Sequence, residues 1–276
     1  MLDTTIRYPA NKECKSNCHD LHNDDIYQYG CEFEFYIDTN RYVFKEAIEQ
    51  IKNDISEFSN VDILLDITAL PTDEDKNHCI QIKPDQSLKD NGIEISIPIT
   101  SKNGVKHYIT HILQLIEKYG YTNEDTGLHF HISTTKSDGI NFNFYLYMLV
   151  CHDKELLSSW LIRSGYSHNV MDILSKNSKT ITRQLKNKKG KIWNIEKISP
   201  NHIEIRSIGG VDYHKETSKI IDEFEMYANS FDSVLNDSNS DYNKNLIEEH
   251  KKLIKSLEIT IKEEFSKAVI EAGLID

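Results

Sequence analysis

Two kinds of apolar spacing divide the first two-thirds of the chain. In short runs, apolar and polar residues alternate, which predicts strands with one apolar and one polar face. Between these runs, apolar residues recur near helical spacing, which predicts helices that bury one side. The predicted strands cover residues 26–37, 61–68, 79–83, 92–98, 127–134, 191–198 and 202–207. The predicted helices cover residues 42–58, 105–120 and 142–161.

The pattern changes after Gly210, where helical spacing dominates. Residues 216–235 and 242–272 predict two amphipathic helices, and the Asn-, Asp- and Ser-rich run at 236–241 predicts the loop between them. We therefore expect an α+β protein: a mostly antiparallel, curved β-sheet with helices on its outer face, followed by a C-terminal helical hairpin. Residues 1–25 would form a loosely held N-terminal segment, 26–210 the sheet domain and 211–276 a hairpin packed on it.

Charge and composition narrow the classes of partner. The chain has 276 residues, enough for one large domain or two small ones, and a formal net charge of −12. An acidic surface repels DNA and RNA, so we expect no nucleic-acid partner. The sequence shows neither a signal peptide nor an apolar run of about 20 residues, so we expect no membrane partner. The five cysteines do not form a disulfide framework, which favours a cytoplasmic protein.

The polar faces of two predicted strands carry candidate metal ligands. Glu32 and Glu34 lie two residues apart, as do His129 and His131, so each pair projects from one strand face. Adjacent carboxylates repel each other unless a cation lies between them, and histidines ligate metals or donate to phosphate. The alternatives are a solvated strand face for the glutamates and partly buried structural histidines.

Two further segments add to this chemistry. Glu204 and Arg206 alternate with isoleucines. They could form an ion pair, or Glu204 could be a metal ligand beside a phosphate-binding arginine. Asp85 lies at a turn after a strand, and Glu94 lies on the polar face of the next strand. If these strands share one sheet, their polar faces form one acidic patch that needs cations. Oxygen ligands favour Mg²⁺ or Mn²⁺ over zinc.

The order of these motifs resembles the amidoligase family, which belongs with the glutamine synthetase-like and glutamate–cysteine ligase-like carboxylate–amine ligases. The motifs are G-x-E-x-E at 30–34, D-x-S-L at 85–88 with G-x-E-I at 92–95, T-G-L-H-x-H at 126–131, and I-E-x-R at 203–206. The resemblance covers about residues 30–210. It implies a glutamine synthetase-like catalytic fold and an ATP-dependent enzyme that joins a carboxylate and an amine through an acyl phosphate.

The resemblance also implies roles for individual residues. The implied metal ligands are Glu32, Glu34, Asp85, Glu94, His129 and Glu204. Glu34 and Arg206 would be catalytic, while His131 and Arg206 would contact ATP. On charge alone, Lys83, Arg183 and Lys191 are further candidates for phosphate contacts. The identities of the carboxylate and the amine, the general base and the oligomeric state stay open, a homo-oligomer being one alternative.

Several alternatives stay open at this point. A zinc hydrolase could use the His129-x-His131 strand, and a guanidino kinase of the same superfamily would stop at phosphoryl transfer. A non-catalytic relative would bind nucleotide or metal alone. A separate structural zinc site is conceivable in the N-terminal segment, where metal-binding residue types gather at Cys14, Cys18, His19 and His22.

Overall fold

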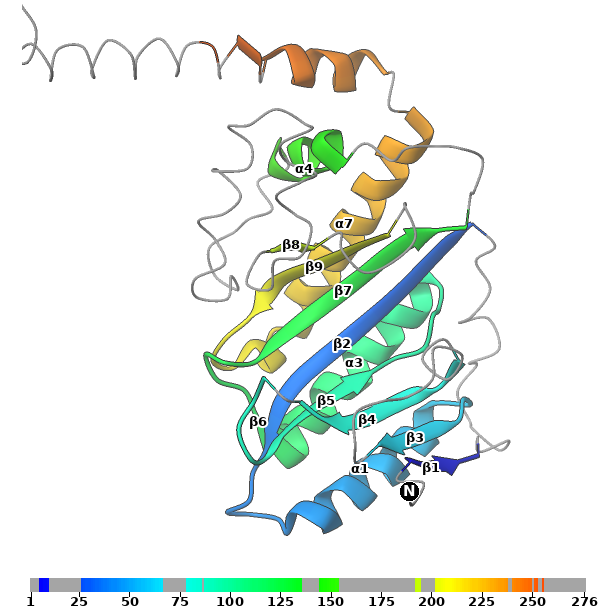
Figure 1. Ribbon diagram of the computed structural model, residues 1–276, viewed down its shortest axis with the longest axis vertical. Coiled ribbons are helices and arrows are strands. Elements are labelled where there is room, and N and C mark those ends of the chain that lie inside the picture. Colours follow the sequence, from blue (N-terminus) through cyan, green and yellow to red (C-terminus); the bar gives the residue numbers. More distant parts are fainter. Residues whose placement is uncertain are drawn as a thin grey trace, which may run out of the picture.

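The computed structural model describes residues 5–9, 26–66, 78–85, 87–135, 144–153, 192–194, 202–237, 240–249, 251–252 and 255. One sheet organises this part of the chain (Figure 1). Its strands are β1 (Thr5–Tyr8), β2 (Tyr27–Ile37), β3 (Ile63–Asp66), β4 (Ile80–Pro84), β5 (Gly92–Ser96), β6 (Gly120–Tyr121), β7 (Gly127–Thr134), β8 (Trp193–Asn194) and β9 (His202–Gly209). The predicted α+β class is confirmed.

The strand order is β1-β3-β4-β5-β2-β7-β9-β8, and β6 pairs with the end of β2. Every pairing given by the described residues is antiparallel except that between β3 and β4. The predicted mostly antiparallel sheet is therefore confirmed. The edge strand β1 was not predicted, because residues 1–25 were expected to form a loosely held segment. Its four residues pair with β3 and are held by those backbone hydrogen bonds.

The helices are α1 (Phe44–Phe58), α3 (Lys102–Tyr119), α4 (Phe144–Asp153), α7 (Thr217–Asp237) and the short 3₁₀ helix η2 (Tyr213–Lys215). In the view of Figure 1, α3 and α7 lie behind the sheet. Helix α3 contacts β2, α7 contacts β7, and α3 and α7 contact each other. The predicted helix at 216–235 is confirmed as α7. Of the second predicted C-terminal helix, residues 242–249 are helical, and much of the remainder lies outside the described residues.

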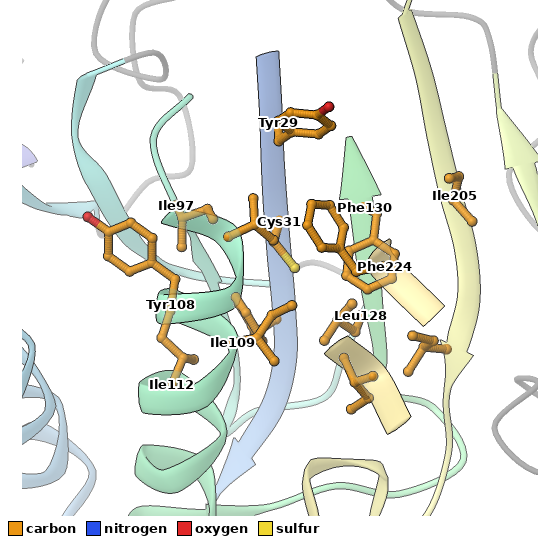
Figure 2. Packing of buried hydrophobic residues seen from close by; sticks show 14 of the residues in the cluster. Tyr29, Cys31, Ile97, Tyr108, Ile109, Ile112, Leu128, Phe130, Ile205 and Phe224 are labelled. Atoms are coloured by element: carbon orange, nitrogen blue, oxygen red, sulfur yellow. The ribbon is translucent and has the colours of Figure 1, made fainter. Parts of the chain in front are cut away.

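The core lies between this helical layer and one face of the sheet (Figure 2). Alternation along β2 buries Cys31, Phe33 and Phe35, as the sequence predicts. Phe130 of β7 packs against Phe224 of α7, with ring centroids 5.2 Å apart. The opposite face of the central strands is consequently left to the polar residues. In the described part of the chain, no helix is long and apolar enough to span a membrane.

Gly120 ends α3 as predicted, but the reason differs from the usual left-handed helix cap. Its φ is −146°, which is extended backbone, and a Cβ there would lie 2.3 Å from the backbone oxygen of Tyr36. We expect Gly120→Ala to lower the free energy of unfolding by about 2 kcal/mol, because the strands must move apart. Chemical denaturation measures this. Gly30→Ala is the control, since its Cβ would meet the Cβ of His131 at 3.5 Å, an ordinary contact.

Candidate metal centre

Strand register brings the predicted ligands face to face across the centre of the sheet. Residues that lie opposite each other on neighbouring strands have Cβ atoms about 5 Å apart. The opposed pairs are Glu32 and His129, Glu34 and Glu94, and His131 and Glu204. Strands that are distant in sequence thus supply one continuous polar patch on β5, β2, β7 and β9.

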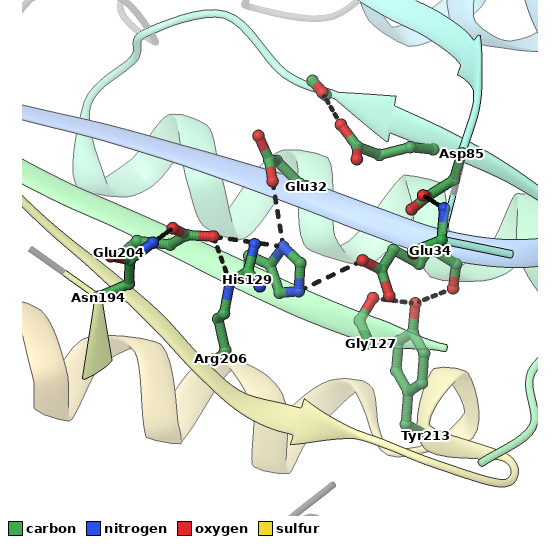
Figure 3. A network of polar contacts seen from close by, with 12 residues as sticks. Glu32, Glu34, Asp85, Gly127, His129, Asn194, Glu204, Arg206 and Tyr213 are labelled. Atoms are coloured by element: carbon green, nitrogen blue, oxygen red, sulfur yellow. Dashed lines mark hydrogen bonds and ion pairs between the residues drawn. The ribbon is translucent and has the colours of Figure 1, made fainter. Parts of the chain in front are cut away.

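The first ligand group consists of Glu32, His129 and Glu204, whose ligand atoms all lie within 4.8 Å of one another. The Nδ1 atom of His129 is 3.1 Å from Oε2 of Glu32 and 3.7 Å from Oε1 of Glu204. Its Nε2 atom lies 3.4 Å from Oε1 of Glu34. A single imidazole, 2% exposed, therefore contacts three carboxylates (Figure 3).

The second ligand group consists of Glu34, Asp85 and Glu94, again with ligand atoms within 4.8 Å of one another. Asp85 follows β4 in a turn, where its Oδ1 accepts a hydrogen bond from the Ser87 amide at 2.6 Å. Because Glu34 contacts His129 and also belongs to the second group, it joins the two groups. Figure 3 shows its carboxylate between His129 and Asp85.

The electrostatics of the patch are those of an excess of carboxylates. Burial raises the pKa of Glu32, but His131 and His129 outweigh this effect and hold it well below its usual value. Burial and the charge of Glu32 raise the pKa of Glu94 despite its 2.8 Å ion pair with Lys83. Burial lowers the pKa of His131, but the charge of Glu32 more than compensates and raises it. Glu94 and His131 therefore hold a proton more strongly than usual, and Glu32 holds one less strongly.

Glu204 is held from both sides by hydrogen-bond donors. The Nε atom of Arg206 donates to its Oε1 at 2.5 Å, and the side-chain amide of Asn194 donates to its Oε2 at 2.7 Å. Burial raises the pKa of Glu204, but the charges of His131, His129 and Arg206 bring it below its usual value. Arg206 thus forms the ion pair that the sequence left as one alternative, and it forms it inside the polar patch.

These donor sets fit divalent cations. Each group offers carboxylate oxygens, and the first adds one imidazole nitrogen, a combination that Mg²⁺ and Mn²⁺ accept. Glu34 and Glu204 are each 3% exposed. Buried carboxylates in such number are costly unless cations neutralise them. All six predicted metal ligands therefore lie where they could hold ions.

Other predicted residues have different positions. His131 is not in either ligand group; its Nε2 lies 3.4 Å from Oε1 of Glu32. Lys83 lies in the patch, where it pairs with Glu94. The remaining candidates lie outside the described residues, namely Arg183, Lys191, Cys14, Cys18, His19 and His22.

Three residues that contact the patch were not predicted from the sequence. His202 lies beside His131, with its Nε2 3.2 Å from Nδ1 of that residue and the two rings stacked. Its even spacing with Glu204 could have revealed it. Asn194, on the two-residue strand β8, lies within the predicted strand at 191–198 but was not singled out there. Tyr213 lies on η2, outside every alternating run, so only the tertiary structure reveals its contact with the patch.

No protein-family model matches the chain, and a search of curated proteins found no significant match.

Proposed function

We propose that this protein is an ATP-dependent carboxylate–amine ligase that forms an amide through an acyl phosphate, with a glutamine synthetase-like catalytic fold. The observation that carries the proposal is the position of Glu34, which links two groups of potential divalent-cation ligands. Two adjacent cation sites on one patch suit phosphoryl transfer, where charge neutralisation and positioning supply most of the catalysis. The motif order described above resembles that of the amidoligase family, and this supports amide ligation among the phosphoryl-transfer reactions.

We assign separate roles in metal binding and phosphate contact to the residues of the patch. Glu32, His129 and Glu204 would hold one divalent ion, and Glu34, Asp85 and Glu94 the other; these ions, when bound, would neutralise phosphate charge. Arg206 orients Glu204 and adds positive charge beside it. His131, whose pKa is raised by Glu32 against the opposing effect of burial, would face an anionic phosphate. Phosphoryl transfer from ATP to the substrate carboxylate would give the acyl phosphate. The amine would then attack its carbonyl carbon, and phosphate would leave.

One observation favours this function over a zinc hydrolase. Such an enzyme would need His129 and His131 on the same ion. Among the described residues, one ligand group combines His129 with two carboxylates, and neither group contains His131. His131 instead lies against Glu32 and His202. Oxygen-rich groups with a single imidazole suit Mg²⁺ or Mn²⁺ better than zinc.

Ligand-dependent thermal unfolding tests the binding part of the proposal. ATP with Mg²⁺ or Mn²⁺ is expected to raise the melting temperature, since a ligand at about 100 times its Kd stabilises the native state by about 2.7 kcal/mol. Glu204→Gln should lose most of this stabilisation because it removes one anionic ligand. Glu225→Gln is the control, since Glu225 lies on α7 and pairs with Lys106 away from the patch. Stabilisation by zinc alone, without any response to ATP, would contradict the proposal.

A further inference from the structure

The turn that follows β9 has an unusual backbone. Gly210 has a φ of +96°, and Asp212 has a φ of +60°, the one positive value among the non-glycine residues that the structure describes. A non-glycine residue in the left-handed region costs about 1 kcal/mol or more and persists where surrounding contacts hold it. The turn therefore depends on contacts with other parts of the fold.

Those interactions tie the turn to two other parts of the fold. The Gly210 amide donates to the backbone oxygen of Thr126, which precedes β7, at 3.0 Å. His214 is 4% exposed, and its Nδ1 lies 2.8 Å from Oγ1 of Thr122. Its Nε2 lies 2.9 Å from Oε2 of Glu117 on α3. The turn is consequently anchored to the end of α3 and to the segment that leads into β7.

The anchored turn aims Tyr213 at the junction between β2 and β7. The hydroxyl of this fully buried tyrosine donates to the backbone oxygen of Glu34 at 2.9 Å and lies 3.3 Å from that of Gly127 (Figure 3). Glu34 follows Phe33 and Gly127 precedes Leu128, and Phe33 and Leu128 are the last residue pair between these two antiparallel strands. One hydroxyl thus joins the strands where their pairing ends.

The position of this contact matters because Glu34 is the residue that links the two ligand groups. Beyond Glu34, β2 leaves β7 and pairs with the short strand β6 at Tyr36 and Ile37. On its other edge β2 stays paired with β5 from Glu32 to Tyr36, so the tyrosine contact holds Glu34 on the β7 side. Without that contact the backbone of Glu34 could shift on this side, and its carboxylate would shift with it. A ligand displaced by a few tenths of an ångström lies outside the usual distance range for divalent ions.

We propose that Tyr213 is a positioning residue that fixes the backbone of Glu34, and so sets the geometry of the second cation site and of the contact between Glu34 and His129 of the first. This inference rests on the divalent-cation centre of the proposed function. It assigns Tyr213 no contact with substrate or metal. The anchors of the turn at His214 act through Tyr213 in the same way.

The test compares Mn²⁺ binding by two tyrosine-to-phenylalanine variants. Tyr213→Phe keeps the buried ring and removes only the hydroxyl. Tyr147→Phe is the matched control, because the Tyr147 hydroxyl is also buried and also donates to a backbone oxygen, that of Tyr227, at 3.1 Å. We expect Tyr213→Phe to weaken Mn²⁺ binding by about 10- to 100-fold, the range for losing a group that orients a ligand. Tyr147→Phe should bind Mn²⁺ as the parent does.

The electron paramagnetic resonance spectrum of bound Mn²⁺ supplies a second readout. It should change in Tyr213→Phe and stay unchanged in Tyr147→Phe, since it reports the ligand arrangement around the ion. Thr122→Val removes one of the two side-chain contacts of His214 and leaves that with Glu117, so it should weaken Mn²⁺ binding by a smaller factor. This variant also tests the inference if Tyr213→Phe does not fold.

Each outcome decides the inference. Parent-like Mn²⁺ affinity and spectrum in Tyr213→Phe, or equal losses in Tyr213→Phe and Tyr147→Phe, would overturn the positioning role while leaving the proposed function in place. With no folded Tyr213→Phe protein, unchanged binding in Thr122→Val would overturn it. A parent protein that binds no Mn²⁺ would contradict the cation centre itself, and the positioning role with it.

Discussion

Glu34→Ala is expected to lower kcat/KM for ATP-dependent amide formation by about 100-fold or more. Glu34 lies 3.4 Å from His129 and belongs to the second ligand group, so its loss removes a ligand where the two sites meet. Divalent ions contribute several kcal/mol to charge stabilisation in phosphoryl transfer, and each 1.4 kcal/mol is about tenfold in rate. The measurement is ATP turnover and amide formation with pools of carboxylates and amines.

Two controls isolate the role of this carboxylate. Glu49→Ala removes an exposed glutamate on α1 and should retain full activity. In metal-free buffer, Glu34→Ala should stay folded, because the change removes a buried carboxylate that lies among others of like charge. Equal turnover in Glu34→Ala and the parent would show that the reaction does not depend on Glu34. Release of ADP without an amide product would identify a kinase instead.

Glu223→Gln is expected to change the free energy of unfolding in a pH-dependent way. Its effect should be about 3 kcal/mol more stabilising at neutral and alkaline pH than in acid. Glu223 lies on α7, and its Oε1 accepts hydrogen bonds from Ser207 and Tyr227, both at 3.1 Å. Burial raises the pKa of Glu223 from 4.5 to about 7, with these two hydrogen bonds opposing the shift. Each unit of pKa difference between folded and unfolded states is worth about 1.4 kcal/mol.

The direction of the pH dependence follows from which state holds the proton. Between about pH 4.5 and 7 the native carboxyl stays protonated while the unfolded one is ionised. The native state then binds more protons, so the contribution of Glu223 to stability falls as pH rises through this window and stays low above it. Glutamine keeps the accepting oxygen and does not ionise, so the variant escapes this loss.

Urea denaturation of parent and variant at pH 4.5 and pH 8 measures the effect. The difference between the two proteins cancels the other titrating groups. Glu225→Gln, on the same helix but with its carboxylate 38% exposed and paired with Lys106, controls for changes in the helix. A stability difference between parent and Glu223→Gln that is the same at both pH values would refute the prediction.

The sequence by itself determined which residues face which side of the regular strands. Where the ladder is regular, side chains in a strand alternate with a period of two, which is a local property of the backbone. The predicted strand at 127–134 therefore matches β7, and the alternation in β2 places Phe33 in the core and Glu32 and Glu34 on the polar side. For the same reason, the sequence could predict that the residues of the candidate metal centre lie on the polar faces of their strands.

Tertiary structure alone decided how these residues combine. The order β5-β2-β7-β9 and its registers depend on pairings between segments far apart in sequence. Only these pairings divide the ligands into two groups with Glu34 between them. They also bury Glu34, which does not fit the solvated strand face that the sequence left as an alternative.

Local period also fails where the ladder is irregular. Ile208 has the same parity as Glu204 and Arg206, which would place it on the polar face, yet it is fully buried in the core. The register between β7 and β9 shifts between Leu128 and Phe130, and an extra residue in β9 reverses the alternation there. Tyr213 reaches Glu34 across 179 positions of sequence. Such contacts arise from the packing of whole elements, whereas the sequence pattern records only the faces that each element presents.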